Sequence, residues 1–151
     1  MYLSLIFCII LLLDRFTKYL VTTRMTEGMS IPVIDSLLHF TYVLNPGAAF
    51  GMLEHNRLFF IVLTLAVLVV IFLLRKKIAQ ETKTVQYGMA FFLGGAIGNL
   101  YDRINTGLVI DFIDLRIWPV FNIADIAICL GVGLILWSVV REEKQKKKVP
   151  N

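Results

Sequence analysis

Charged side chains are scarce in this chain of 151 residues: they make up 17% of the sequence, whereas 58% of the residues are hydrophobic. Ordinary soluble domains carry about 25% charged residues. A chain of this length also lacks the polar side chains needed to cover the surface that it would expose to water. The mean hydropathy of +0.76 is likewise too high for a soluble monomer. The composition argues against a soluble globular enzyme, a disordered chain and a DNA-binding domain, and the length predicts one domain.

Histidine and cysteine are also rare, with two residues of each. His39 and His55 have no histidine or cysteine companion at a metal-ligand spacing, so we expect no metal site. Cys8 and Cys129 both lie inside long apolar runs. This placement favours two buried, inert thiols over a disulfide.

Long apolar stretches dominate the rest of the sequence. They run from about Tyr2 to Val21, Leu58 to Leu74, Val85 to Leu100 and Phe121 to Val140. A helix needs roughly 17–25 residues to cross the hydrocarbon core, so all four qualify if polar groups are tolerated at one end of the first and third. We predict an all-α membrane protein with one domain over residues 1–151. Its four transmembrane helices are expected at about 2–21, 58–74, 85–103 and 121–140, followed by a basic tail at 141–151.

The first stretch does not have the pattern of a cleaved signal peptide. No basic region precedes its apolar core. Asp14, Arg15 and Lys18 stand where small residues would precede a cleavage site. We therefore expect a retained membrane helix.

Basic residues are distributed unevenly among the connecting segments. Nine follow the second or the fourth stretch: Arg75, Lys76, Lys77, Lys83, Arg141, Lys144, Lys146, Lys147 and Lys148. Four lie in the two opposite loops: Arg24, Arg57, Arg103 and Arg116. The positive-inside rule then places both termini in the cytoplasm. The lysine-rich tail fits contact with anionic lipid better than binding of RNA.

The two outer loops are residues 22–57 and 101–120. Within the first, Leu37 to Leu44 is rich in Leu, Phe, Tyr and Val, and Asn45-Pro46-Gly47 follows as a turn. We expect a small extracytoplasmic β-sheet between the first two helices. The turn either clamps a substrate or closes a hairpin, and the loop over 22–57 is the expected gate.

Polar residues within the predicted spans gather at one depth. Six of them fall in the outer third of a hydrocarbon core about 30 Å thick: Asp14, Lys18, Asn99, Arg103, Asn122 and Asp125. On each helix the two residues are three or four positions apart and share a face; Asn122 and Asp125 are expected in the first two turns of the fourth span. Charge inside a bilayer is costly, so such residues usually face the bundle interior and mark function.

The remaining acids and the glycines allow further expectations. Asp125 has no basic residue on its own helix, so it either stays protonated or has a companion. Asp111 and Asp114 lie in a segment that we expect to be extended, Val109 to Asp114, where residues three apart point to opposite faces. Only one of them can then face the bundle. Gly94 and Gly98 form a small-xxx-small pair that allows close helix packing.

Two of the basic groups keep alternative roles at this stage. Arg103 either grips a carbonyl or lipid phosphate, or pairs with the neighbouring Asp102. Lys18 and Asp14 either position the first loop or form a structural ion pair.

Five sequence blocks match one known family. They are Asp14 to Lys18, Asn45 to Gly51, Gly94 to Arg103, Val109 to Phe112 and Phe121 to Asp125. In these blocks, which occur in the family's order, the chain resembles the prolipoprotein signal peptidases, also called signal peptidase II. These are membrane-embedded aspartic endopeptidases of bacteria. Each block alone is weak evidence, but the five together are specific.

The resemblance implies a catalytic dyad of Asp111 and Asp125. It also implies a set of supporting polar residues: Asp14, Lys18, Asn45, Asn99, Arg103 and Asn122. The implied substrate is a lipoprotein precursor that is diacylglyceryl-modified on a cysteine and is cleaved on the amino side of that cysteine, without a metal or organic cofactor. The implied setting is the bacterial plasma membrane, crossed several times, with the active site near the extracytoplasmic face. We expect a monomer that contacts membrane lipids and binds no nucleic acid.

Two other functions are compatible with four spans and buried acids. A small proton-coupled transporter would place its charged site near the midplane between repeated halves, whereas these acids lie near the outer boundary and no internal repeat is visible. A membrane scaffold without catalysis leaves the convergence of Asp111, Asp125, Asn99 and Asn122 unexplained, although their insertion is costly.

Overall fold

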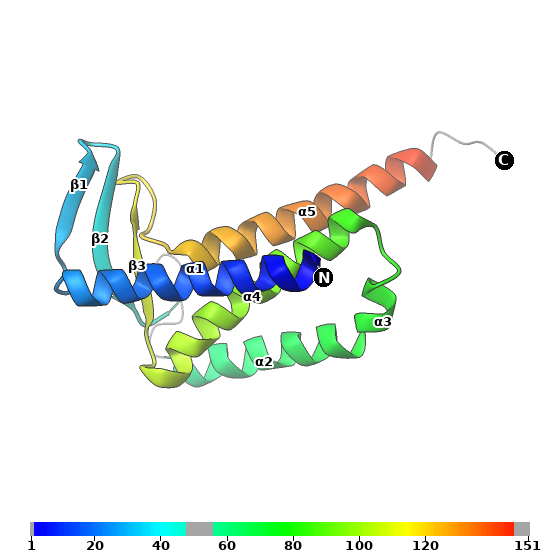
Figure 1. The fold of residues 1–151 in the computed structure, drawn as a ribbon, viewed down its shortest axis with the longest axis horizontal. Coiled ribbons are helices and arrows are strands. Elements are labelled where there is room, and N and C mark those ends of the chain that lie inside the picture. The colour runs from blue at the N-terminus through cyan, green and yellow to red at the C-terminus, as the bar shows by residue number, and fades with distance from the viewer. Residues whose placement is uncertain (1, 48–55, 147–151) are drawn as a thin grey trace.

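The chain folds into a bundle of long helices with a small β-sheet at one end (Figure 1). The computed structural model describes residues 2–47 and 56–146. In chain order its elements are α1 (Tyr2–Arg24), β1 (Ser30–Ile34), β2 (Leu38–Asn45), α2 (Arg57–Leu73), α3 (Arg75–Ile78), α4 (Lys83–Asn105), β3 (Val109–Asp114) and α5 (Ile123–Lys146). Each predicted span falls on one long helix, namely α1, α2, α4 or α5. The motif residues Ala48 to Gly51, His55 and the tail lysines Lys147 and Lys148 lie outside the described residues.

Helix α4 is the centre of the bundle and packs against both α1 and α5 through its glycines. A Cβ atom at Gly94 would lie 2.9 Å from Cγ2 of Ile10 on α1. A Cβ atom at Gly95 would collide with the backbone carbonyl of Ala124 on α5. Farther along, a Cβ atom at Gly88 would lie 2.8 Å from the carbonyl oxygen of Gly131. The predicted packing role of the glycine run is correct, because small residues let three backbones approach closely.

The outer surface of the bundle is apolar. Helix α2 consists almost entirely of large hydrophobic residues, yet none of its side chains is buried. Leu12 on α1 and Trp137 on α5 are 68% and 66% exposed. Water-soluble proteins rarely leave such extended apolar surface uncovered, so this is the exterior of a bundle that lies in lipid.

Length and composition single out one helix among the described residues. The segment Ile123–Gln145 is long and apolar enough to cross a membrane, and Arg57–Leu73 is apolar but shorter. Asp14, Arg15 and Lys18 lower the hydropathy of α1, and all three lie in the half of this helix that is nearer the sheet (Figure 1).

The two cysteines correct one expectation. Cys8 and Cys129 are free thiols, as predicted, but both are exposed on the outside of the bundle and not buried. An apolar run in a lipid-facing helix exposes much of its surface, so apolar sequence context alone does not imply burial in this class of protein.

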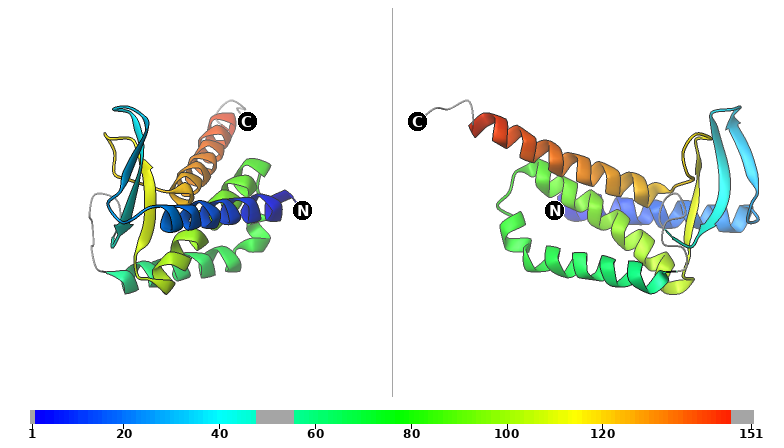
Figure 2. Two further views of the ribbon diagram at one scale, coloured as in Figure 1. Left: turned by 60° about the vertical axis from the view of Figure 1, so that its left-hand side comes forward. Right: turned by 180° about the vertical axis from the view of Figure 1, so that it is seen from behind.

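The sheet contains three antiparallel strands in the order β1-β2-β3. Strands β1 and β2 come from the predicted region, and Asp35 lies in the turn between them. The third strand comes from the second outer loop, so a sheet built only between the first two helices was an incomplete prediction. Figure 2 shows that the sheet lies at one end of the bundle, while α1 begins and α5 ends toward the other.

We predict that Gly95→Ala destabilises the protein. The added methyl group would meet the backbone of α5, and forced overpacking costs about 1–3 kcal/mol. Thermal unfolding of the detergent-purified variant measures the effect. Gly133→Ala is the matched control, because a Cβ atom there meets nothing within 4 Å. Equal melting temperatures for the two variants would contradict the packing described here.

Candidate active site

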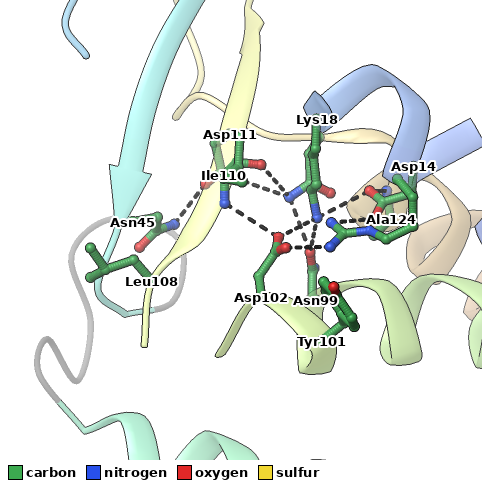
Figure 3. Close-up of polar contacts among 12 residues, drawn as sticks. Asp14, Lys18, Asn45, Asn99, Tyr101, Asp102, Leu108, Ile110, Asp111 and Ala124 are labelled. Atoms are coloured by element: carbon green, nitrogen blue, oxygen red, sulfur yellow. Dashed lines mark hydrogen bonds and ion pairs between the residues drawn. The ribbon is translucent and has the colours of Figure 1, made fainter. Parts of the chain in front are cut away.

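The polar residues of the bundle meet beneath the sheet, where α1, α4, β3 and the start of α5 come together (Figure 3). Asp14 and Asn122 are fully buried, and Lys18 retains 1% exposure. Asn99 and Asp111 are buried as well. Residues far apart in the sequence thus form one cluster, as their predicted common depth indicated.

Four charged side chains form a closed network at the base of this cluster, which we call the ionic quartet: Asp14, Arg15, Lys18 and Asp102. The Lys18 ammonium lies 3.1 Å from Oδ1 of Asp14 and 2.7 Å from Oδ2 of Asp102. The Arg15 guanidinium lies 3.2 Å from Oδ2 of Asp14 and 2.7 Å from Oδ1 of Asp102. Two cations therefore face two anions, and the quartet carries no net charge.

The quartet also holds backbone groups of neighbouring elements. Oδ1 of Asp14 accepts a hydrogen bond of 3.1 Å from the backbone N–H of Ala124, in the first turn of α5. Oδ2 of Asp102 accepts one of 3.4 Å from the N–H of Ile110 on β3. A carboxylate near a helix N-terminus satisfies an otherwise unpaired donor and interacts favourably with the helix dipole. The two acids thereby connect α1 and α4 to the elements that carry Asp125 and Asp111.

Asp102 and Arg15 are members of the cluster that the sequence did not reveal. Asp102 was considered as a partner for the adjacent Arg103, but its ion pairs are with Arg15 and Lys18. One signal was available, because Asp102 follows Asn99 by three positions and so shares its helix face. Nothing in the sequence indicates that Arg15 reaches across to α4.

The start of α5 is fixed by a reciprocal pair of hydrogen bonds between Asn122 and Asp125. Oδ1 of Asn122 accepts from the backbone N–H of Asp125 at 2.9 Å, and Oδ2 of Asp125 accepts from the backbone N–H of Asn122 at 3.0 Å. This is the geometry of a capping box. Asn122 therefore precedes the helix, which begins at Ile123. The expectation that Asn122 lies in the first turns was wrong, because its side chain ends up serving as the cap.

Asp125 is held by uncharged donors. Besides the backbone N–H of Asn122, the side-chain amide of Asn99 donates to Oδ1 of Asp125 at 2.8 Å. Lys18 acts on Asp125 through Asn99, because its ammonium donates to Oδ1 of Asn99 at 2.9 Å. The amide of Asn99 is thus oriented by a cation at one end and presents its N–H to the carboxylate at the other.

Asp111 on β3 is held in the same way. Its Oδ1 accepts a hydrogen bond of 2.6 Å from the amide of Asn122, and its Oδ2 accepts one of 2.9 Å from the amide of Asn45. Burial and the negative charge of Asp125 raise the pKa of Asp111 to about 7, although the two amide donors act in the opposite direction. Asp111 therefore retains a proton near neutral pH far more readily than an ordinary aspartate.

The other acid of β3 points elsewhere. Asp114 accepts a hydrogen bond of 2.8 Å from Thr41 on β2 and pairs with Arg116 at 3.0 Å. These hydrogen bonds, with the charge of Arg116, hold its pKa below the ordinary value despite partial desolvation. The prediction that only one of Asp111 and Asp114 can face the bundle is confirmed, and the one that does so is Asp111.

Arg103 and the Asn45 turn lie side by side at the edge of the cluster. Nη2 of Arg103 donates to the carbonyl oxygen of Gly47 at 3.1 Å, and the guanidinium carbon lies 4.7 Å from the ring centre of Phe60. The N–H of Gly47 donates to Oδ1 of Asn45 at 2.9 Å, which closes an Asx turn. This turn ends a strand that pairs with β1 and β3, so it does not close a hairpin. Arg103 is thus bound to a backbone carbonyl of this chain, and Asp102, the other partner predicted for it, pairs with Arg15 and Lys18.

The donor set of the cluster suits acid–base chemistry. In the described part of the chain, no group of three or more His, Cys, Asp or Glu side chains could hold a metal ion. Instead, Asn122 contacts two carboxyl groups, those of Asp111 and Asp125. Two neighbouring carboxyl groups ionise in coupled steps and can share one proton, which is what general acid–base hydrolysis requires.

Comparison with known proteins agrees with this chemistry. The family described as "Signal peptidase (SPase) II" matches residues 6–141. A lipoprotein signal peptidase of Pelotomaculum thermopropionicum is 41% identical over 148 residues, covering 98% of this chain and 97% of the relative. One from Halalkalibacterium halodurans is 42% identical over 148 residues, with 95% and 94% covered.

Solved structures of bacterial membrane enzymes share the fold. One, determined at 2.3 Å by the in meso method, has a TM-score of 0.92 at 35% identity and covers 99% of this chain and 94% of its own. A second, at 1.9 Å, has a TM-score of 0.83 at 37% identity, with 91% and 92% covered. These similarities argue against a transporter and against a scaffold without catalysis. The chain belongs to the signal peptidase II family, whose members are aspartic-type endopeptidases.

Proposed function

We propose that this protein removes the signal peptide from diacylglyceryl-modified lipoprotein precursors by hydrolysis on the amino side of the lipidated cysteine. The observation that carries the proposal is the contact of Asn122 with both carboxyl groups, through its side chain to Asp111 and its backbone to Asp125. It holds the two acids together as a dyad. The relatives at about 40% identity are named lipoprotein signal peptidases.

In the proposed reaction the dyad holds one proton. Asp111, with its pKa of about 7, carries that proton and donates it to the scissile carbonyl oxygen. Asp125 is ionised and removes a proton from the attacking water, whose oxygen forms the new bond to the carbonyl carbon. When the tetrahedral intermediate collapses, the carbon–nitrogen bond breaks, Asp125 passes its proton to the leaving amine of the cysteine, and a hydroxyl of the intermediate returns a proton to Asp111.

The three asparagines position the dyad without adding charge. Asn45 and Asn122 donate to Asp111, while Asn99 donates to Asp125. A cation in direct contact would favour the ionised form of both carboxyl groups and so remove the shared proton. Neutral amides fix the geometry and leave one proton in place.

Arg103 holds the turn that ends β2. Its bond to the carbonyl of Gly47 fixes Asn45 at the edge of the dyad. We propose that this turn clamps the extended substrate chain, and that residues 22–57 admit it from the membrane surface. Arg103 and Asn45 act here as positioning residues.

The proposed setting is the bacterial plasma membrane. Helices α1, α2, α4 and α5 cross it as one domain, both termini lie in the cytoplasm, and the dyad lies near the extracytoplasmic face. The apolar exterior of the bundle and the basic residues at the end away from the sheet support this orientation. We further propose that the protein acts as a monomer, needs no cofactor, and takes its substrate and surrounding lipids as its partners.

Asp111→Asn and Asp125→Asn should each reduce precursor cleavage to background and leave membrane insertion intact. Loss of a general acid or base lowers the rate by roughly 10²-fold to 10⁴-fold. A gel-shift assay with purified protein and a diacylglyceryl-modified precursor measures this. Asp114→Asn is the matched control on the same strand and should retain cleavage. Normal processing by either dyad variant would remove that residue from the catalytic role.

The pH dependence of cleavage should shift when Asn45 is replaced by Ala. The amide of Asn45 stabilises the ionised form of Asp111, so its loss raises the pKa of Asp111. In the parent protein we expect kcat/KM to fall as the pH rises through about 7, where Asp111 loses its proton. In Asn45→Ala this fall should occur at higher pH, whereas Thr41→Val, which removes a donor to Asp114, should leave it in place. If kcat/KM of Asn45→Ala falls at the same pH as in the parent protein, or at a lower pH, the proposed location of the proton on Asp111 is contradicted.

Cysteine labelling should reveal the proposed orientation. In a variant lacking Cys8 and Cys129, a membrane-impermeant maleimide should label Asp35→Cys in intact cells stripped of any outer layer. Glu143→Cys should be labelled only after the cells are permeabilised, because α5 is proposed to end in the cytoplasm. Labelling of Glu143→Cys from the outside would contradict the proposed orientation if Asp35→Cys stays unlabelled, and the four-span arrangement if both positions are labelled.

A further inference from the structure

A cavity lies well away from the dyad, at the other end of the bundle. Helices α2 and α4 meet near the sheet and diverge toward the opposite end (Figures 1 and 2). Between them and the start of α1 is a cavity of about 490 Å³. Its walls are mainly apolar and include Phe7, Ile71, Met89 and Leu93. None of the residues of the candidate active site lines it.

Two basic side chains lie at this cavity. Arg75, at the start of α3, is part of its lining. One of the five N–H groups of the guanidinium donates to the carbonyl of Phe72 at 2.9 Å, and the group also lies over the Phe72 ring. Lys83 donates to the side chain of Gln86, which lines the cavity as well. A guanidinium held beside an apolar cavity is suited to bind a phosphate in bidentate fashion.

The charges on the nearby elements favour an anionic occupant. Lys76 and Lys77 belong to the same short helix as Arg75 and are exposed. Glu81 is the acid next to this group in the sequence, and its backbone carbonyl accepts a hydrogen bond from Gln86. This stretch of the chain carries four basic side chains, Arg75, Lys76, Lys77 and Lys83, against one acidic side chain, Glu81, and of these five Arg75 lines the cavity.

The charge beside the cavity argues against a signal peptide as its occupant. A signal peptide would bring a basic segment to this end of the bundle, where Arg75 and the lysines would repel it. A flexible acyl chain with an anionic headgroup suits both the apolar walls and the guanidinium in the lining.

We propose that this cavity is a binding site for an anionic phospholipid, with one acyl chain between α1, α2 and α4 and the phosphate on Arg75. The lipid fills the space that separates α2 from the rest of the bundle. This lipid would belong to the cytoplasmic leaflet, and that placement rests on the membrane orientation proposed above. The site itself is independent of the peptidase reaction.

Photolabelling tests the proposal. The full chain is placed in phosphatidylcholine vesicles that contain a trace of phosphatidylglycerol with a photoreactive group in its acyl chain, and the labelled residues are mapped by mass spectrometry. We expect labels on Phe7, Met89 and Leu93, about fivefold or more above those from an equally photoreactive phosphatidylcholine, since one surface cation contributes on the order of a fivefold preference for anionic lipid. Arg75→Gln should abolish this preference. Lys77→Gln, on the same helix but outside the lining, is the matched control and should keep it.

Three outcomes would overturn the proposal. The first is equal labelling by the two lipids, and the second is a preference that survives in Arg75→Gln. The third is displacement of the label by lipoprotein precursor, which would make the cavity a substrate site. Cleavage measured in the same vesicles separates the two proposals, because loss of the lipid preference with intact cleavage leaves the peptidase function in place.

Discussion

The ionic quartet of Asp14, Arg15, Lys18 and Asp102, in which Arg15 is partly exposed and the other three are buried, is the constraint on which the rest of the structure depends. Two cations inside an apolar bundle are stable only if two anions neutralise them, and removing one partner of a buried pair costs about 3–5 kcal/mol. The quartet satisfies this condition between α1 and α4. Through Asp14 it also holds the N-terminus of α5, and through Asp102 the backbone of β3. The relative placement of four elements follows from one electrostatic requirement.

Neutral amide side chains, and not cations, hold the two acids of the proposed dyad. Lys18 is bound to two carboxylates and reaches Asp125 through the amide of Asn99 alone. Asp111 and Asp125 are thus held by neutral donors, and burial together with the charge of Asp125 raises the pKa of Asp111 to about 7. In the proposed reaction the two acids share one proton, which a direct ion pair to either acid would remove. The structure therefore places its cations one residue away from the acids that they help to position.

Much of this arrangement could be predicted from the sequence. Helix periodicity and depth placed Asp14, Lys18, Asn99 and Asp125 in one layer, because those quantities depend on local geometry alone. The glycine run predicted close helix contacts for the same reason. The family resemblance supplied the pairing of Asp111 with Asp125.

The rest depended on contacts between distant segments. The role of Asp102 was obscured by its neighbour Arg103, since the sequence does not show that Arg15 and Lys18 approach from another helix. The third strand comes from the second outer loop, and its pairing with β2 is a long-range contact. Asn122 serves as a cap because of the direction in which the chain enters α5. The exposure of Cys8 depends on which helix face meets lipid.

The sharing of one proton between Asp111 and Asp125 can be observed directly. Infrared difference spectroscopy of the purified protein, titrated across neutral pH, detects the carbonyl stretch of a protonated carboxyl group. We expect one such group that disappears as the pH rises through about 7 and is missing from Asp111→Asn. If both acids are already ionised below that pH, or if the signal persists in Asp111→Asn, the proposed dyad chemistry is contradicted.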